Sequence, residues 1–590
     1  MQPGDFYQQQ ISETQIKLNR VKRIGLLVSL MRLAVFLATV LISFYVRSSN
    51  LILGSTIVVG FIIFLVLVSI YTNLKRERSY FELLIKLNKN ELDALAGNFE
   101  AFNSGKEYTD HLHPFSEDMD LFGRGSIFQS INRSATVSGE QKLAGLLGSN
   151  NIESIPEKQN AIRELSEKAK WRQAFRVNAG LIEEQAEPEK IISWLKNYKQ
   201  QLPGFVPILA LVFPFISLAF LVLASLSVIE WTLLLLPLLT GLLISGVFLM
   251  KVNRINEMAT RLSSTFQQYA IILDAIETEK FNSDWLAQQQ NQIQSNNKTA
   301  SLIFSELGKN LSSLDQRKNI FFAFIANGFT LWDLRFSAKI EKWILTNEKI
   351  VEACFESVAF FDAYSSLANY AFNHPEYSYP VINENQKTTI HAVNLGHPLL
   401  RKEKMVTNNF EILTDEFFII TGANMAGKST FLRTVGIGIV MSNCGLPVCA
   451  TQFNYTPIKL ISSMRSSDSL QDEESYFFAE LKRLKFIVDE IKKDRYFIIL
   501  DEILKGTNSK DKQEGSKKFV QRLVSFNSTG IIATHDLSLC QLESELPQIR
   551  NHYFDAEIVN DELHFDYKFK DGVCKNMNAS FLLKKMGIVE

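Results

Sequence analysis

The sequence predicts a chain that combines three structural classes: a C-terminal α/β domain, an all-α region of long helices, and two transmembrane helical hairpins. Three observations predict this combination. Two long apolar blocks occupy residues 24–71 and 205–250. Charged and apolar residues then alternate with helical periodicity, and with almost no proline, over residues 251–372. From residue 373 onward, short β-branched and aromatic runs alternate with helical ones, as is typical of α/β domains.

Length and composition limit the possible functions. A chain of 590 residues is too long for one hydrophobic core, so we expect two or three domains. The 62 Lys and Arg residues against 63 Asp and Glu residues leave a formal net charge of -1. This balance excludes a global basic field for DNA, so any nucleic-acid contact must be local. The five cysteines are scattered without a CxxC pair, so we expect reduced thiols and neither a disulfide nor zinc.

Each apolar block is long enough to cross a membrane twice, because about 20 helical residues span the hydrocarbon layer. The first block runs over Ile24–Val46 and Leu51–Tyr71, and the arginine that interrupts it, Arg32, lies close enough to its start to reach the headgroups. The second block turns at Glu230-Trp231. Buried hairpins of a soluble protein are the alternative, and the length of these runs argues against it. The sequence therefore predicts four spans in contact with membrane lipid.

Charged residues at the ends of the hairpins predict the orientation. Lys and Arg flank the inner ends of both hairpins, whereas Arg47 is the lone positive residue in the outer turns. The positive-inside rule then predicts a multi-pass protein of the cell (inner) membrane, with both termini and the soluble domains on the cytoplasmic side. A cleavable signal peptide is not expected, because the first apolar run begins late and another follows it directly.

These features divide the chain into six predicted segments. Residues 72–200 are polar with a helical pattern, and residues 251–372 are expected to form levers or a dimer scaffold. The predicted boundaries are a polar leader at 1–23, hairpin 1 at 24–71, the first part of a helical core at 72–200, hairpin 2 at 205–250, lever helices at 251–372 and the α/β domain at 373–590.

A phosphate-binding loop is the strongest signal in the α/β domain. Residues 422–430 form a complete G-x4-G-K-[ST] pattern, with an apolar strand before it and a helical run after it. Glycines let the backbone wrap phosphates, Lys428 reaches the β- and γ-phosphates, and Ser429 binds magnesium. The sequence therefore predicts ATP and Mg²⁺ as cofactors. The predicted cofactor-binding residues of the loop are Gly422, Asn424, Met425, Gly427, Lys428, Ser429 and Thr430.

Two further strands deliver polar residues at their ends. The strand at 496–500 ends in Asp501-Glu502, of which Asp501 is placed for the magnesium shell and Glu502 to orient or deprotonate the attacking water. The strand at 530–534 delivers His535, which we expect to sense the γ-phosphate. Two solvated acids at a strand end are the alternative, which the pairing with the loop disfavours. The predicted catalytic residues are Glu502, Lys428 and His535, and the predicted magnesium ligands are Ser429 and Asp501.

This combination resembles the ABC-type ATPase domain of the DNA mismatch repair MutS family. The family's loop appears here as Thr421–Thr430, and its Asn424-Met425 pair separates it from generic P-loops. Gly396-His397-Pro398, Asp501-Glu502-Ile503 and Ala533-Thr534-His535 are also similar to family elements. A weaker resemblance before residue 373 covers the start of the family's helical core and the end of its lever helices. The resemblance implies an ABC-type P-loop ATPase that hydrolyses ATP.

The resemblance also implies a homodimer. Ser475 lies where the family has its signature serine, which contacts the γ-phosphate held by the opposite subunit, so the site would bind ATP with Ser475 acting in trans. A helix-capping role for Ser475 is the alternative, because serine before a helical run is a favoured cap.

Parts of the family pattern are missing. The mismatch-recognition domain of the family is not found, and membrane hairpins replace DNA-facing domains, so DNA stays a candidate partner while direct mismatch reading is not expected. Leu504-Lys505 precede Gly506 where the family has Gly-Arg, so the dimer-facing loop differs. A mechanical ATPase that acts on a protein partner without DNA is the second hypothesis. An ABC transporter is a weaker third, because no LSGGQ-like sequence occurs.

Overall fold

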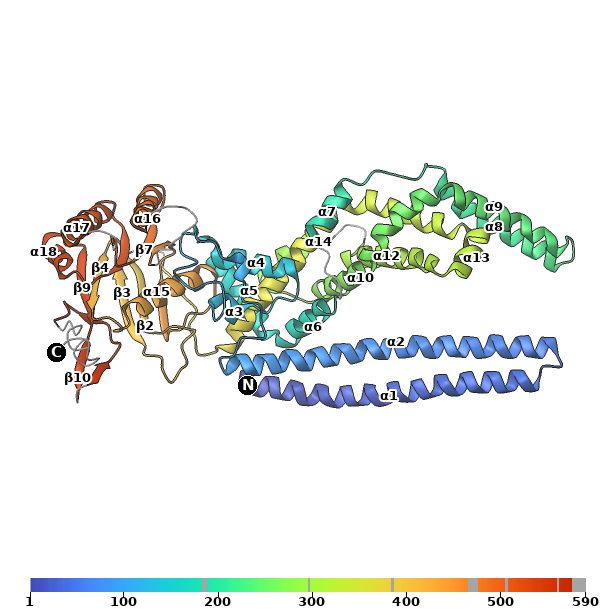
Figure 1. Cartoon of the computed structure of the whole chain (residues 1–590), viewed down its shortest axis with the longest axis horizontal. Helices are drawn as coiled ribbons and strands as arrows, with labels where there is room; N and C mark the ends of the chain where they lie inside the picture. Colours follow the sequence, from blue (N-terminus) through green and yellow to red (C-terminus); the bar gives the residue numbers. More distant parts are fainter. Residues whose placement is uncertain are drawn as a thin grey trace.

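The computed structural model is an elongated molecule with the sheets at one end and two helical hairpins at the other (Figure 1). It describes residues 2–182, 188–294, 298–383, 387–464, 476–504, 508–559 and 562–575. A helical core lies between the two ends, and both hairpins project from it in the same direction (Figure 1). The predicted division into helical regions and a C-terminal α/β region is confirmed.

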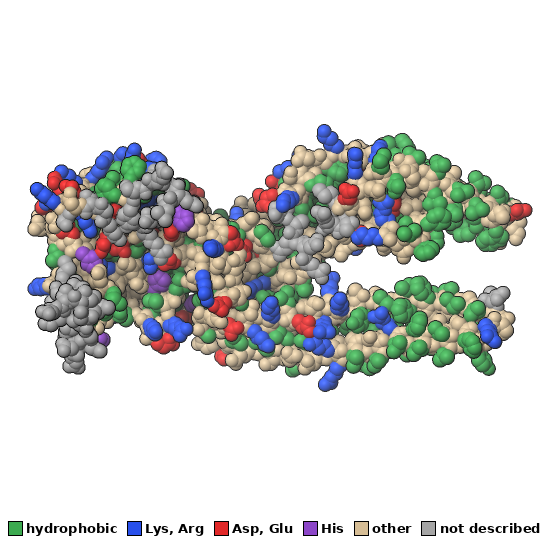
Figure 2. All heavy atoms as spheres, in the orientation of Figure 1, with side chains coloured by type: hydrophobic (Ala, Val, Ile, Leu, Met, Phe, Trp, Pro, Cys, Tyr) green, Lys and Arg blue, Asp and Glu red, His purple; other side chains and the backbone are tan. Residues whose placement is uncertain are grey.

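Hairpin 1 consists of two long antiparallel helices, α1 (Pro3–Tyr45) and α2 (Asn50–Leu95). Both are long and apolar enough to cross a membrane. Helix α2 continues without a break from the apolar segment to Leu95, so one rigid rod joins the hairpin to the helical core. Apolar side chains cover the part of the hairpin farthest from the sheets, while charged side chains gather nearer to them (Figure 2).

Hairpin 2 differs from the expectation in its returning limb. Its outgoing helix α8 (Val206–Ser225) is long and apolar enough to span a membrane. The return passes through the short helix η2 (Trp231–Leu234) into α9 (Leu235–Val247), and a 64° bend separates this limb from α10 (Leu249–Thr278). The backbone of Phe248 leaves the helical region at the bend. The sequence predicts four spans, whereas the described chain has three helices that meet the requirement for a span and one bent pair.

The helical core is organised around α14 (Trp332–Asn373), a helix of 42 residues. Its C-terminal half is buried among α3, α4, α5 and α6, and its N-terminal half packs against α8, α12 and α13. The long helices expected over residues 251–372 are present as α10, α12 and α14. The remaining core helices are η1 (Lys106–Tyr108), α3 (Ile127–Ile131), α4 (Val137–Gly148), α5 (Ile155–Glu167), α6 (Ala169–Gly180), α7 (Pro188–Lys196), α11 (Asp284–Gln292), α12 (Ala300–Asp315), η3 (Gln316–Lys318) and α13 (Ile320–Thr330).

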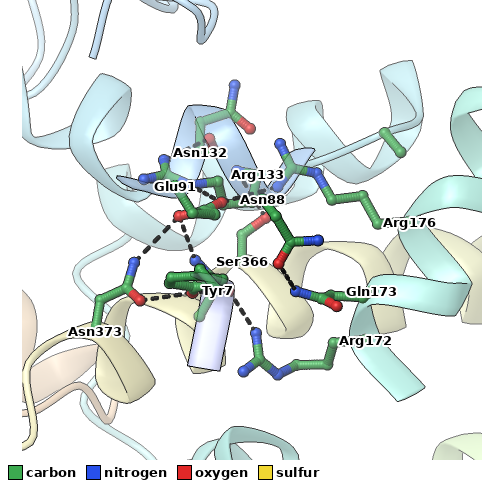
Figure 3. A network of polar contacts seen from close by, with 12 residues as sticks. Tyr7, Asn88, Glu91, Asn132, Arg133, Arg172, Gln173, Arg176, Ser366 and Asn373 are labelled. Atoms are coloured by element: carbon green, nitrogen blue, oxygen red, sulfur yellow. Dashed lines mark hydrogen bonds and ion pairs between the residues drawn. The ribbon is translucent and has the colours of Figure 1, made fainter. Parts of the chain in front are cut away.

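A buried polar network fastens hairpin 1 to the core (Figure 3). The carboxylate of Glu91 on α2 lies 2.7 Å from Arg133 Nε and 3.0 Å from the guanidinium of Arg176. The other oxygen of Glu91 accepts hydrogen bonds from Asn369 and Asn373 on α14. From α1, the Tyr7 hydroxyl donates to Asn373 Oδ1 over 2.7 Å. Both helices of the hairpin are thus bonded to α14 at its C-terminal end, next to the α/β domain.

We expect Glu91→Ala to lower the free energy of unfolding by about 3–5 kcal/mol, because it leaves the buried Arg133 and the half-buried Arg176 without their counter-charge. The exposed ion pair between Glu100 and Arg124 provides the control. Glu100→Ala is expected to change stability by less than about 1 kcal/mol. Melting temperatures of the detergent-solubilised variants test this difference. Equal melting temperatures for the two variants would contradict a stabilising role for the network.

The α/β domain contains a six-stranded sheet in the order β12-β9-β4-β8-β7-β6. All neighbouring strands are parallel except the edge pair β12 and β9. A second sheet has the order β1-β5-β2-β3, and β10 pairs with β11 in a ribbon. The strands are β1 (Val381–Ile382), β2 (Thr388–Leu395), β3 (Asn408–Leu413), β4 (Phe417–Gly422), β5 (Gln452–Tyr455), β6 (Lys459–Ser463), β7 (Tyr496–Asp501), β8 (Thr529–Ala533), β9 (Ile549–Phe554), β10 (Ala556–Val559), β11 (Glu562–Phe565) and β12 (Lys570–Asp571).

Helices cover the two faces of the six-stranded sheet. One face packs with α15 (Lys428–Asn443) into the hydrophobic core that continues into the helical region. The other face packs against α16 (Tyr476–Glu490) and α17 (Ser509–Ser525) in a separate apolar cluster. The short helices η4 (Leu537–Gln541) and α18 (Leu542–Glu545) follow β8. Because α15 belongs to the shared core, a shift of this helix is felt directly by the helical region.

Candidate active site

The order of the central strands brings the predicted site residues together. Strand β8 lies between β4 and β7, and all three run in the same direction. Their carboxyl ends therefore meet at one edge of the sheet, where ligands of α/β proteins bind. The loop after β4, the acids at the end of β7 and His535 after β8 line one cavity of about 830 Å³. Each predicted site residue within the described part of the chain lines this cavity, except Gly422, which ends β4 at the same edge but does not line the cavity.

Two glycines allow the loop to take its shape. Gly422 has φ 151°, and a Cβ atom there would lie 2.6 Å from the carbonyl oxygen of Phe554 on β9. Gly427 has φ 100°, and a Cβ atom there would lie 3.0 Å from the ring of Tyr567. A side chain at either position would collide with its neighbour or strain the backbone. Gly427 is also the N-cap of α15, so the free amides that open this helix face the cavity and favour an anion.

Lys428, the first residue of α15, is buried at the base of the cavity. Its Nζ donates to the carbonyl oxygens of Gly422 at 2.8 Å and Ala423 at 3.0 Å. Burial lowers the pKa of this amine, and the opposing charges of Asp501 and Glu502 raise it in part. An anionic phosphate is a stronger acceptor than two neutral carbonyls, so this ammonium group suits a phosphate in the cavity.

Ser429 and Asp501 form a pair of oxygen donors. The Ser429 hydroxyl donates to Asp501 Oδ2 over 2.6 Å, so a hydroxyl and a carboxylate from two different elements lie side by side. Hydroxyl, carboxylate and phosphate oxygens are the ligands that Mg²⁺ prefers. The donor set of this pair therefore fits the magnesium ion that the sequence predicts.

Glu502 and His535 are in direct contact. His535 Nε2 lies 2.8 Å from Glu502 Oε1 and 3.3 Å from Lys428 Nζ. One ring nitrogen cannot donate to a carboxylate and accept from an ammonium group at the same time, so the shorter contact indicates an Nε2–H that donates to Glu502. The backbone of Glu502 has φ 51°, and its N–H donates to the carbonyl of Ala533. This uncommon conformation, held from the neighbouring strand, aims the carboxylate into the cavity.

The outer wall of the cavity contains residues that the sequence did not reveal as site residues. Asn424, Met425 and Thr430 are exposed at its rim. Further lining side chains come from β2, the segment after it, β3, α15, β9 and the segment after β11, and most of these segments are far from the loop in the sequence. The missed lining residues are Leu395, Leu400, Lys404, Val406, Asn408, Phe431, Thr434, Phe554 and Tyr567. Ser475, Gly506 and Thr507 lie outside the described residues.

His397, from the Gly396-His397-Pro398 element, also lines the cavity. Burial, followed by the nearby charge of Arg433, lowers its pKa to about 4, so it is neutral at pH 7. Because the unfolded chain binds this proton more readily, stability should fall as pH drops from about 6.5 toward 4. At pH 4.5, His397→Asn should therefore recover roughly 2 kcal/mol of the free energy of unfolding that the unmodified protein loses on acidification. Melting temperatures of both proteins at pH 4.5 and 7.5, followed by circular dichroism, measure the effect, and identical pH dependence would contradict it.

A short segment of the helical core contacts the base of α15. Arg433 on α15 donates from Nε to the carbonyl oxygen of Asp118 over 3.0 Å. The buried carboxylate of Asp118 accepts from the Ser462 hydroxyl and the Met464 amide at the end of β6. At Gly436 the helix approaches Met119 so closely that a Cβ atom would collide with the sulfur. The segment of Asp118 and Met119 therefore connects α15 and the sheet to the helical core.

The C-terminal part of the chain is similar to proteins of one family. Residues 418–584 match the family model MutS domain V. The chain is 30% identical over 241 residues to DNA mismatch repair protein MutS of Finegoldia magna, which covers 40% of this chain and 28% of that protein. It is 28% identical over 238 residues to DNA mismatch repair protein MutS of Thermotoga maritima, and this match covers 40% of this chain and 29% of that protein. It is 29% identical over 199 residues to human MutS protein homolog 4, and this match covers 32% of this chain and 21% of that protein. Each match thus spans less than a third of the relative's length.

Proposed function

We propose that the chain, whose C-terminal domain matches the family model MutS domain V, is a membrane-anchored MutS-like ATPase. In this proposal ATP closes a homodimer and the helical core passes the motion to DNA. The observation that carries this proposal is the convergence of Lys428, the Ser429–Asp501 pair and the Glu502–His535 pair in one cavity. The cavity combines a phosphate anchor, a magnesium site and an oriented carboxylate, which are the parts that phosphoryl transfer to water needs.

Each group has a distinct role in the proposed reaction. Lys428 and the amides at the start of α15 bind the β- and γ-phosphates, and Ser429 and Asp501 hold the magnesium ion. The ion neutralises charge on the phosphates when it is bound. Glu502 orients the attacking water and accepts its proton, while His535 holds the Glu502 carboxylate through the 2.8 Å contact. His535 is therefore a positioning residue as well as a candidate sensor of the γ-phosphate.

Dimerisation completes the site in this proposal. The rim at Asn424, Met425 and Thr430 is exposed in the single chain, so the phosphate end of the cavity is open to a partner. Ser475 of a second copy is proposed to close it, as the family resemblance implies. The closure would press on α15, which contacts the core segment around Asp118 through Arg433. Motion would then travel along α14 to the end where Asn373 bonds hairpin 1.

The membrane anchor is supported by the three long apolar helices and the bent pair. Both hairpins project in the same direction, so one bilayer can receive them while the α/β domain stays at the far end (Figure 1). Six positive residues at the inner end of hairpin 1 fit this arrangement, because positive residues favour the cytoplasmic side. They are Arg20, Lys22, Arg23, Lys75, Arg76 and Arg78.

Measuring ATPase rates of detergent-purified protein without DNA and with duplex, mismatched or branched DNA tests the proposal. We expect basal hydrolysis that requires Mg²⁺ and a higher rate with at least one form of DNA. Stimulation that weakens with rising salt concentration would indicate phosphate contacts, as expected for local basic patches. The same rate with every DNA would overturn the DNA part and favour action on a protein partner. Absence of hydrolysis under all conditions would overturn the proposed enzyme.

A further inference from the structure

Helix α13 (Ile320–Thr330) presents an apolar face that no other element of the described chain covers. Phe321 is 84% exposed and Ile320 is 81% exposed, and Phe324 and Ile325 on the same side are also exposed. The helix contains no charged residue. Isolated exposed apolar side chains are ordinary, but four adjacent ones of this size on one helix mark a contact surface. The sequence analysis had assigned this segment to the lever helices.

The opposite side of α13 packs directly on α9 of hairpin 2. Ala326, Asn327 and Gly328 are buried there. A Cβ atom at Gly241 of α9 would lie 2.1 Å from the carbonyl oxygen of Gly328, so the two backbones touch without intervening side chains. Small residues of this kind allow close packing of helices within membranes. Helix α13 is therefore joined to the apolar hairpin, beside which it lies in Figure 1.

Helix α9, which α13 contacts, also exposes apolar side chains. Leu236, Leu239 and Leu243 of α9 are exposed beside the contact. If hairpin 2 lies in a bilayer, the medium that surrounds these leucines also surrounds α13, because no polar element separates the two helices.

The two ends of α13 are held together. Arg317 Nε, before the helix, lies 3.1 Å from Asp333 Oδ2, after it. The indole N–H of Trp332 donates to the carbonyl of Ser313 at the end of α12. The chain then reverses at Leu331, which has φ 49°, and continues as α14. Helix α13 thus connects the end of α12 to the start of α14, and its position fixes the start of α14.

We propose that α13 is a further membrane-embedded element, whose face of Ile320, Phe321, Phe324 and Ile325 contacts lipid hydrocarbon and so couples the start of α14 directly to the bilayer. This inference rests on the proposed membrane anchoring. It adds a fifth apolar segment to the four of the hairpins. Helix α14 would then follow a lipid-contacting helix at its start and join the polar network around Glu91 near its end. Movements of α14 would then be resisted by, or transmitted to, the membrane.

Depth-dependent quenching of a fluorophore tests the proposal in the full-length protein. A nitrobenzoxadiazole label is attached to Phe321→Cys, to Leu221→Cys on the exposed side of α8, and to Leu112→Cys, which is 85% exposed in the core. The five native cysteines are buried, and signal from labelled unmodified protein is subtracted. The proteins are reconstituted in vesicles of phosphatidylcholine and phosphatidylglycerol. Ile325→Cys serves as a second probe, and retained ATP hydrolysis shows that each variant is folded.

We expect nitroxide-labelled lipid to quench the probes at 321 and 325 to an extent comparable with 221, while aqueous iodide quenches only the probe at 112. Iodide quenching at 321 and 325, with lipid quenching kept at 221, would overturn the placement of α13 and leave the membrane anchoring intact. Protection of 321 and 325 from both quenchers would indicate a protein cover and would also overturn it. Iodide quenching at 221 would overturn the membrane anchoring itself.

Discussion

Replacing Lys428 by alanine is expected to weaken ATP binding at least about 100-fold, or on the order of 3 kcal/mol. The reason is geometric as well as electrostatic. Lys428 is the buried cation at the base of the loop, and its Nζ lies among the carbonyl oxygens of Gly422 and Ala423 and the side chain of His535. Without Lys428, the backbone amides at the start of α15 are the remaining hydrogen-bond donors to the phosphates at the base of the loop. Equilibrium binding of a fluorescent ATP analogue to the purified protein measures the loss.

A matched control separates this effect from a general loss of charge. Lys518 lies on α17 of the same domain and is exposed, where it pairs with Glu514. Lys518→Ala removes the same charge without touching the cavity, so its nucleotide affinity should equal that of the unmodified protein. Nucleotide affinity of Lys428→Ala within a factor of about two of this control would show that the phosphates bind elsewhere.

The candidate site was predictable because its residues follow apolar strands at short, fixed spacing. Gly422, Asp501 and His535 each end or follow a buried parallel strand, and such strands bring their carboxyl ends to one edge. The sequence therefore predicted that these residues meet at one edge without knowing the strand order. The contact between His535 and Glu502 was not predictable, because it depends on β8 lying between β4 and β7.

The missed features share a physical cause. Tyr567 and Phe554 reach the cavity only through tertiary folding of segments far from the loop, and no local pattern marks them. The polar network around Glu91 joins α1, α2, α6 and α14 across more than 270 residues of sequence. Helix α13 is an 11-residue apolar run, and such a short run reads equally well as a buried helix of a soluble core. Its exposure follows from how α12 and α14 pack.

The fourth span illustrates the same limit. Composition alone measures how apolar the segment 205–250 is, and it is apolar enough for two crossings. The bend of 64° near Phe248 lies between α9, which packs against α13, and α10, which packs against α12. A hydropathy pattern contains no information on such contacts, so the sequence predicted a fourth span without the bend that the structure has there.

Replacing Glu502 by glutamine is expected to preserve ATP binding and slow hydrolysis by about 10²–10⁴-fold. Glutamine has the size and shape of glutamate, and its amide oxygen can still accept the hydrogen bond from His535 Nε2. It cannot accept a proton from water, so the chemical step is lost while the loop, Lys428 and the Ser429–Asp501 pair stay in place. Single-turnover hydrolysis of radiolabelled ATP measures the rate, and Glu514→Gln on the exposed face of α17 is the matched control.

The same variant reports on the proposed dimer. If a second copy closes the cavity over ATP, a chain that binds but does not hydrolyse ATP accumulates in the closed form. Sedimentation in detergent should then give a dimer for Glu502→Gln with ATP and Mg²⁺, and a smaller species for the same protein without nucleotide or for Lys428→Ala. Normal turnover in Glu502→Gln would remove Glu502 from the reaction. A slow variant that stays monomeric at every concentration would retain the role of Glu502 and show that one chain suffices. A site shared between two copies would, by contrast, lose activity on dilution.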